Sequence, residues 1–212
     1  MDSFRNARII NPGFGKKAFS KIEIRDILIS ILVLSISFTI ILVRGNPTFF
    51  SNDTVKNILS FFLLSVVMVV FSFMLHEMGH KFVAQRMGAW SEYRMYPMGL
   101  GLCLIFSLIG FLFAAPGAVY IAGRIDDKMN GKISIAGPAV NLVLGFICYG
   151  LWFVTTGRVS AIFFLMAHLN GFLAAFNMIP IFPLDGSKIL KWNPVVFVVA
   201  LALGVSLVLL TW

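Results

Sequence analysis

Six stretches of the chain are almost entirely apolar, and they alternate with short polar segments that hold most of the charged residues. Five of them are 17 to 22 residues long: 27–43, 58–75, 133–154, 161–178 and 195–211. An α-helix needs roughly 20 apolar residues to cross a hydrocarbon layer of about 30 Å. The pattern therefore predicts an all-α polytopic membrane protein with about five spanning helices.

The sixth stretch, residues 100–115, is short for a span and is interrupted by Gly101 and Gly110. It either crosses the membrane or enters and returns on the same face. If it crosses, ten of the seventeen Lys and Arg residues lie on the inner side; if it returns, fourteen do. The positive-inside rule favours the return. We expect a re-entrant or β-hairpin segment near residues 97–117 that packs against the helices or lines a wet cavity, because irregular backbone is not stable in lipid.

Composition agrees with a membrane protein, since 59% of the residues are hydrophobic and 12% are charged. The formal charge of +8 comes from basic residues in the loops beside apolar runs, so we expect the lipid bilayer, and not nucleic acid, as the partner of these charges. Residues 1–26 are expected to be a basic cytosolic segment, followed by one domain over 27–212. Ser20 and Glu23 have the spacing of a capping box before the first helix.

The candidate chemistry lies at the end of the second apolar run, where the chain reads His76-Glu77-Met78-Gly79-His80. On a helix, side chains four residues apart project from one face, offset by about 40°, so both imidazoles can reach one metal ion. Glu77 can then take a proton from a water that zinc has made acidic. The alternative is a set of polar residues at the wet end of a membrane helix, but the complete motif favours a zinc peptidase with one Zn²⁺ per chain.

A catalytic zinc ion needs a third protein ligand and an open position. His168 precedes the remaining candidate, Asp185, by 17 residues, about 25 Å of helical rise, so it is expected to bond to a neighbouring helix. Cys103 and Cys148 are isolated in apolar stretches and are expected to be buried apolar residues. Asp185 follows two prolines that disrupt the helix, and only the returning topology brings it to the side of the two histidines.

Three asparagines lie within predicted spans. Asn141 is about 12 Å along its helix from the inner end. It either donates to a substrate carbonyl or developing oxyanion, or ties two helices together by a hydrogen bond, and both possibilities stay open. Asn170 and Asn177 share one helix face and flank Ala174, which indicates close helix packing.

The chain resembles the site-2 proteases, which are intramembrane zinc metalloproteases, in three motifs that cover about residues 57–190. The motifs are His-Glu-Met-Gly-His at 76–80, Gly-Pro-Ala-Val-Asn at 137–141, and Asn-x-x-Pro-x-x-Pro-x-Asp-Gly at 177–186. Ser187 departs from the family, whose members often have a second glycine there. The chain is expected to lack the PDZ or CBS domain of many members. The resemblance implies His76, His80 and Asp185 as zinc ligands, Glu77 as general base and acid, and Asn141 and Asn177 beside the substrate.

The expected function is that of an intramembrane zinc endopeptidase. It would hydrolyse a peptide bond within, or at the cytosolic edge of, a transmembrane helix of another membrane protein, with its active site near the cytosolic face. A zinc protease that acts on soluble or prenylated peptides typically takes a glutamate as third ligand, and the last glutamate of this chain is Glu92. A non-proteolytic scaffold or transporter with a structural zinc site would not need Glu77.

Overall fold

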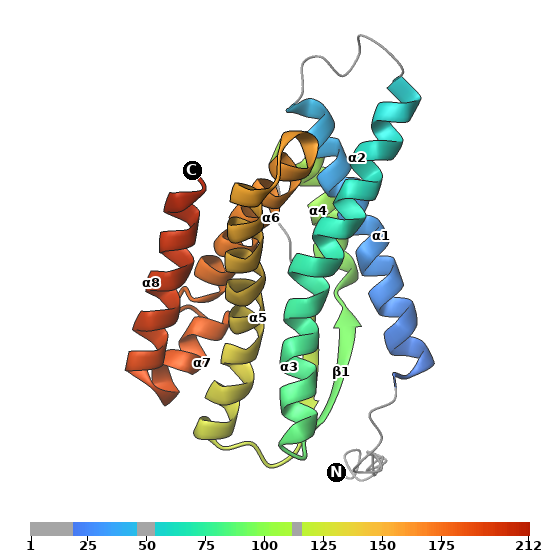
Figure 1. Ribbon diagram of the computed structural model, residues 1–212. Coiled ribbons are helices and arrows are strands. Elements are labelled where there is room, and N and C mark those ends of the chain that lie inside the picture. The colour runs from blue at the N-terminus through green and yellow to red at the C-terminus, as the bar shows by residue number, and fades with distance from the viewer. Residues whose placement is uncertain (1–18, 46–53, 112–115) are drawn as a thin grey trace.

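The computed structural model describes residues 19–45, 54–111 and 116–212, so most of the predicted N-terminal segment 1–26 lies outside the described residues. Figure 1 shows a bundle of helices with a small sheet beside it. The elements follow in the order α1 (Lys21–Arg44), α2 (Thr54–Met68), the π-helical turn η2 (Val69–Met74), α3 (Leu75–Arg86), β1 (Trp90–Met95), α4 (Pro97–Leu108), β2 (Gly117–Ala122), α5 (Asp127–Val154), α6 (Gly157–Asn177), α7 (Asp185–Trp192) and α8 (Pro194–Leu210).

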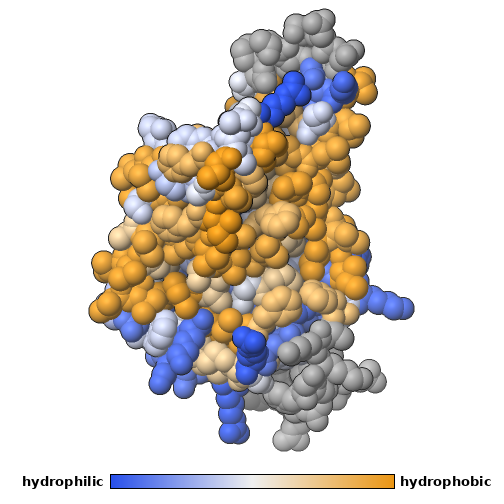
Figure 2. Space-filling model, in the orientation of Figure 1, coloured by the Kyte–Doolittle hydropathy of each residue, from blue (hydrophilic) through white to orange (hydrophobic). Residues whose placement is uncertain are grey.

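Four helices in the described part of the chain are long and apolar enough to cross a membrane. They are α1, the continuous helix Val55–Arg86 formed by α2, η2 and α3, and the helices α5 and α6. The fifth predicted span, α8, has 17 residues and rises about 26 Å, just short of the hydrocarbon thickness. A wide band of hydrophobic surface lies between two polar ends (Figure 2), which confirms the all-α polytopic membrane fold.

Helix α1 begins at Lys21, six residues before the apolar run. The Ser20 hydroxyl caps it by accepting a hydrogen bond from the Glu23 N–H at 3.1 Å, as the spacing predicts. The Glu23 carboxylate does not return to the cap. It accepts hydrogen bonds from Lys81 Nζ of α3 at 2.5 Å and from the Tyr93 N–H of β1 at 2.9 Å. Helix α1 extends beyond the apolar run because the Glu23 carboxylate has hydrogen-bond partners inside the protein.

The segment between α3 and α5 returns to the side from which it starts. Strands β1 and β2 are antiparallel, with Trp90 opposite Ala122 and Met95 opposite Gly117, so the two ends of the intervening segment are neighbours. Helix α4 follows β1 and precedes β2 in the chain. It rises about 18 Å, which is too short to cross the membrane. Gly110, at a φ of 87°, adopts the left-handed conformation just after this helix. The expected re-entrant or hairpin segment is thus a short helix between two paired strands.

Small residues allow α5 to approach its neighbours closely. A Cβ added at Gly79 of α3 would lie 2.9 Å from the carbonyl oxygen of Ala136 on α5, so this contact requires a glycine. Gly145 of α5 and Gly171 of α6 leave room for the Leu207 side chain of α8 in the same way. Packing through small residues is typical of helices in membranes, and here it fixes α3 against α5 at the height of the histidines.

Two further predictions concern single side chains. His168 Nδ1 lies 3.1 Å from the Thr211 hydroxyl oxygen, which confirms a hydrogen bond between α6 and the end of α8. Cys103 and Cys148 are both buried free cysteines, in agreement with their interpretation as small core residues.

Candidate metal centre

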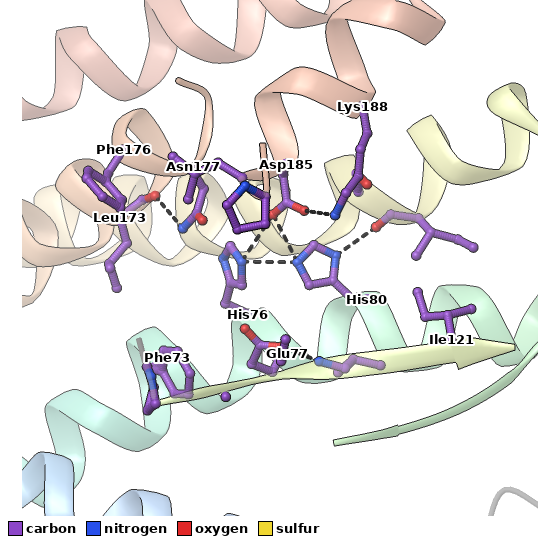
Figure 3. A pocket seen from close by; sticks show the side chains of 18 of the residues that line it. Phe73, His76, Glu77, His80, Ile121, Leu173, Phe176, Asn177, Asp185 and Lys188 are labelled. Atoms are coloured by element: carbon purple, nitrogen blue, oxygen red, sulfur yellow. Dashed lines mark hydrogen bonds and ion pairs between the residues drawn. The ribbon is translucent and has the colours of Figure 1, made fainter. Parts of the chain in front are cut away.

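Three ligand atoms meet where α3 faces the start of α7. His76 and His80 lie one turn apart on α3, and Asp185 is the first residue of α7. The Nε2 atoms of the two histidines are 3.1 Å apart, and Asp185 Oδ2 lies 3.1 Å from that of His80 and 3.5 Å from that of His76. Figure 3 shows the two imidazoles and the carboxylate directed toward one another. The structure therefore brings the three predicted ligands together.

This triangle fits a zinc ion. Zinc bonds of 2.0 to 2.1 Å in tetrahedral geometry place neighbouring ligand atoms about 3.3 Å apart, close to the observed separations. Gly137 of α5 leaves the space that the imidazoles occupy. A Cβ at this position would lie 2.6 Å from Nε2 of His76 and would also collide with Nε2 of His80. The types of donor atom, their separations and the lack of a side chain at Gly137 all agree with a metal site of three protein ligands.

Both histidines present Nε2 to the centre because Nδ1 is engaged elsewhere. The Nδ1–H of His80 donates to the carbonyl oxygen of Ile133 at 2.8 Å, and a carbonyl oxygen can only accept. Nδ1 of His76 lies 2.5 Å from Oδ1 of Asn141. Contacts of this kind fix the tautomer and the ring orientation of histidines that bind metals.

The two oxygens of Asp185 face different neighbours. Oδ2 faces the histidines, whereas Oδ1 lies 3.7 Å from Nζ of Lys188, one turn further along α7. Burial alone would raise the pKa of the Asp185 carboxyl, but the adjacent His80 and His76 imidazoles lower this pKa below its ordinary value. The residue is therefore a carboxylate, and its charge lies beside the Nε2 atoms of the two histidines. Such a set of groups favours a cation between them.

Glu77 lies beside the ligands without joining them. Its side chain is buried between α3 and β2, and Oε2 accepts a hydrogen bond from the Val119 N–H at 3.1 Å. Figure 3 shows the carboxylate on the β2 side of the two imidazoles. A carboxylate next to a metal centre, and not used as a ligand, is available to transfer protons.

A cavity of about 270 Å³ opens in front of this centre. Its walls include the apolar side chains of Phe73, Ile121 and Leu173, together with the Asn177 side chain from the end of α6. Asn141 is fully buried behind His76 and is not part of these walls. This burial fits the alternative of a hydrogen bond between helices, and a contact of Asn141 with substrate stays a prediction.

The sequence of the site is similar to that of known peptidases. Residues 153–193, which include Asp185, match peptidase family M50. The chain is 39% identical over 202 residues to Putative zinc metalloprotease MJ0611 of Methanocaldococcus jannaschii, an alignment that covers 92% of this chain and 97% of that protein. The chain belongs to family M50, the site-2 proteases. This zinc-dependent family confirms the resemblance and the predicted cofactor.

A second relative is more distant. Zinc metalloprotease MJ0392 of the same organism is 27% identical over 133 residues, which are 62% of this chain and 34% of that protein. No solved structure matches the chain.

Four contributions to the site are not predicted from the sequence: the Ile133 carbonyl, the Val119 N–H, and the side chains of Ser72 and Asn170. The first two are backbone groups, which leave no signal in the choice of residue. Asn170 is visible as a polar residue in an apolar helix, but its partners on η2 and α5 are distant in sequence. Only the packing of three helices brings them together.

Proposed function

We propose that this chain is an intramembrane zinc endopeptidase that cuts a transmembrane segment of another membrane protein near its cytosolic edge. The observation that carries the proposal is the position of His76, Glu77 and His80 within the continuous apolar helix Val55–Arg86. Ionisable groups within a membrane helix are costly and are by default functional. Asp185 completes the ligand set from a segment just outside the neighbouring span.

His76, His80 and Asp185 would hold the zinc ion. When bound, zinc supplies a Lewis acid that polarises a peptide carbonyl and makes a water molecule acidic. Glu77 would accept a proton from the attacking water as its oxygen bonds to the carbonyl carbon. Glu77 would then give the proton to the amide nitrogen as the carbon–nitrogen bond breaks. Asn177, in the cavity wall, would contact the substrate backbone.

Strand β2 supports the binding of an extended substrate. The Val119 N–H donates to Glu77 and not to β1, so one edge of β2 faces the catalytic carboxylate instead of its partner strand. Gly117, Val119 and Ile121 all line the cavity. An unwound peptide can add to such an edge through backbone hydrogen bonds.

The distribution of charge supports a cytosolic active site. Among the residues that the structure describes, the Lys and Arg residues Arg44, Lys56 and Arg158 belong to the end where α1 finishes and α2 and α6 begin, three of the seventeen in the sequence. The other fourteen would lie with the N-terminus and the metal centre on the cytosolic side, as the positive-inside rule requires.

A substrate helix must unwind before it can be cut, since its carbonyls are engaged in hydrogen bonds. Gly or Pro in the substrate lowers the cost of unwinding by about 1 to 3 kcal/mol per residue relative to Ala. The test uses a single-span reporter and a matched version whose helix-breaking residues are replaced by leucine. We expect the first to be cut within the cytosolic third of its span and the second to be cut more slowly. Mass spectrometry showing cuts confined to a soluble loop, or equal rates, would reject the proposal.

A further inference from the structure

Behind the metal centre, a chain of hydrogen bonds joins η2, α5 and α6 and ends on His76. It consists of Ser72, Asn141 and Asn170, whose side chains are all fully buried. Neither asparagine lines the cavity. Because water has little access to compete for these groups, each hydrogen bond constrains the next.

The amide of Asn141 can be oriented from its partners. Its Nδ2 lies 2.7 Å from the backbone carbonyl oxygen of Ser72 and 2.8 Å from Oδ1 of Asn170. A carbonyl oxygen only accepts, so the Asn141 NH₂ group must face Ser72, and its two protons are both used. The Asn141 Oδ1 is left facing Nδ1 of His76 at 2.5 Å.

The amide of Asn170 is fixed by the same reasoning. Its Nδ2 donates to the carbonyl oxygen of Met166 at 2.9 Å, one turn earlier in α6, and to the Ser72 hydroxyl oxygen at 2.9 Å. Its Oδ1 therefore faces Asn141. Two backbone carbonyls, those of Ser72 and Met166, set the direction of every hydrogen bond in the chain.

An amide oxygen can only accept, so the hydrogen bond between Asn141 and His76 requires a proton on Nδ1 of His76. We infer that Asn141 is a positioning residue that holds His76 in its Nδ1–H tautomer, with Asn170 and Ser72 holding Asn141 in turn. Nε2 of His76 then keeps its lone pair and faces Asp185 and His80. The inference rests on the proposed zinc site, and it gives Asn141 a role toward the ligand in place of a contact with substrate.

The tautomer can be measured directly. The chain has three histidines, so zinc-free protein with ¹⁵N-labelled histidine in detergent micelles gives few imidazole signals. We expect His76, identified by its loss in His76→Gln, to be protonated on Nδ1, and Asn141→Leu to mix the two tautomers. Protonation of His76 on Nε2 in the unaltered protein would overturn the inference. This measurement contains no zinc and no substrate, so it is decided separately from the proposed peptidase activity.

Zinc affinity, measured by competition with a chelator, gives the second readout. Loss of a residue that orients a metal ligand typically weakens binding 10- to 100-fold, and we expect that loss for Asn141→Leu. Asn170→Leu should also bind zinc more weakly, although Asn170 touches no ligand. Ser72→Ala removes only the hydroxyl that accepts from Asn170, so it should weaken zinc binding by less. This variant keeps the test decisive if the leucine variants do not fold.

Ser107→Ala is the matched control, because Ser107 is fully buried like Ser72 but its hydroxyl donates to the Leu104 carbonyl of α4 at 2.7 Å and not to the chain to His76. Its zinc affinity should equal that of the unaltered protein. If the folded Asn141, Asn170 and Ser72 variants all bind zinc as tightly as this control, the positioning role is refuted.

Discussion

Replacing Lys81 by methionine should destabilise the fold strongly, although Lys81 does not line the cavity. Its Nζ lies 2.5 Å from both carboxylate oxygens of Glu23, and both side chains are fully buried. Methionine would leave the carboxylate with the Tyr93 N–H but without its cationic partner. Removing one partner of a buried ion pair costs about 3 to 5 kcal/mol, because the remaining charge is not solvated.

The double variant Lys81→Met with Glu23→Gln should recover most of this loss. The glutamine oxygen can still accept from the Tyr93 N–H, and no uncompensated charge stays buried. The assay is denaturant unfolding in mixed micelles, followed by circular dichroism, for the single variants and the double variant.

The matched control is Lys191→Met. Lys191 pairs with Asp127 at 2.9 Å, but both side chains are about two-thirds exposed. Loss of an exposed pair should change the free energy of unfolding by less than about 1 kcal/mol. An effect of Lys81→Met as small as that of this control would show that no buried ion pair joins α1 and α3.

Three further predictions concern the metal centre and the topology. Gly137→Ala should lower the zinc content, because the added Cβ would collide with both imidazoles. Gly150→Ala on the same helix is the control, since the structure has open space for a Cβ there. Equal zinc contents in the two variants would contradict the packing. Asp185→Ala should lower zinc content about as much as His76→Ala, since each removes one of three ligands, and loss only in the histidine variant would show that Asp185 is misassigned. In a background without Cys103 and Cys148, cysteines introduced by Asp127→Cys and by Lys188→Cys should react with impermeant thiol reagents from the cytosolic side only; labelling of the first from outside would mean that residues 100–115 cross the membrane.

The local parts of the site are readable from the sequence. His76, Glu77 and His80 lie within one helical turn or so, and a 3.6-residue period is enough to predict that both imidazoles share a face. Asp185 is over a hundred residues away, but the short run at 100–115 and the distribution of basic residues predict that it lies on the same side of the membrane as the histidines. The geometry of the three ligand atoms agrees with that deduction.

Other features depend on contacts that no local pattern encodes. In the sequence, Lys81 is one more basic residue near the end of a predicted helix. In the structure its side chain is fully buried, because Glu23, 58 residues earlier, lies against it. The π-helical turn η2 has an ordinary apolar composition. The role of Asn141 stays open in the sequence because its partners Ser72 and Asn170 come from two other helices.

Zinc content and reporter cleavage, measured together in Glu77→Gln, test the proposed peptidase mechanism most directly. Glutamine keeps the size of the side chain and leaves His76, His80 and Asp185 intact, but it cannot accept a proton from water. We expect this variant to bind as much zinc as the unaltered protein and to lose nearly all cleavage of a single-span reporter. Cleavage that continues at the original rate with zinc bound would contradict a peptidase mechanism in which Glu77 is the base.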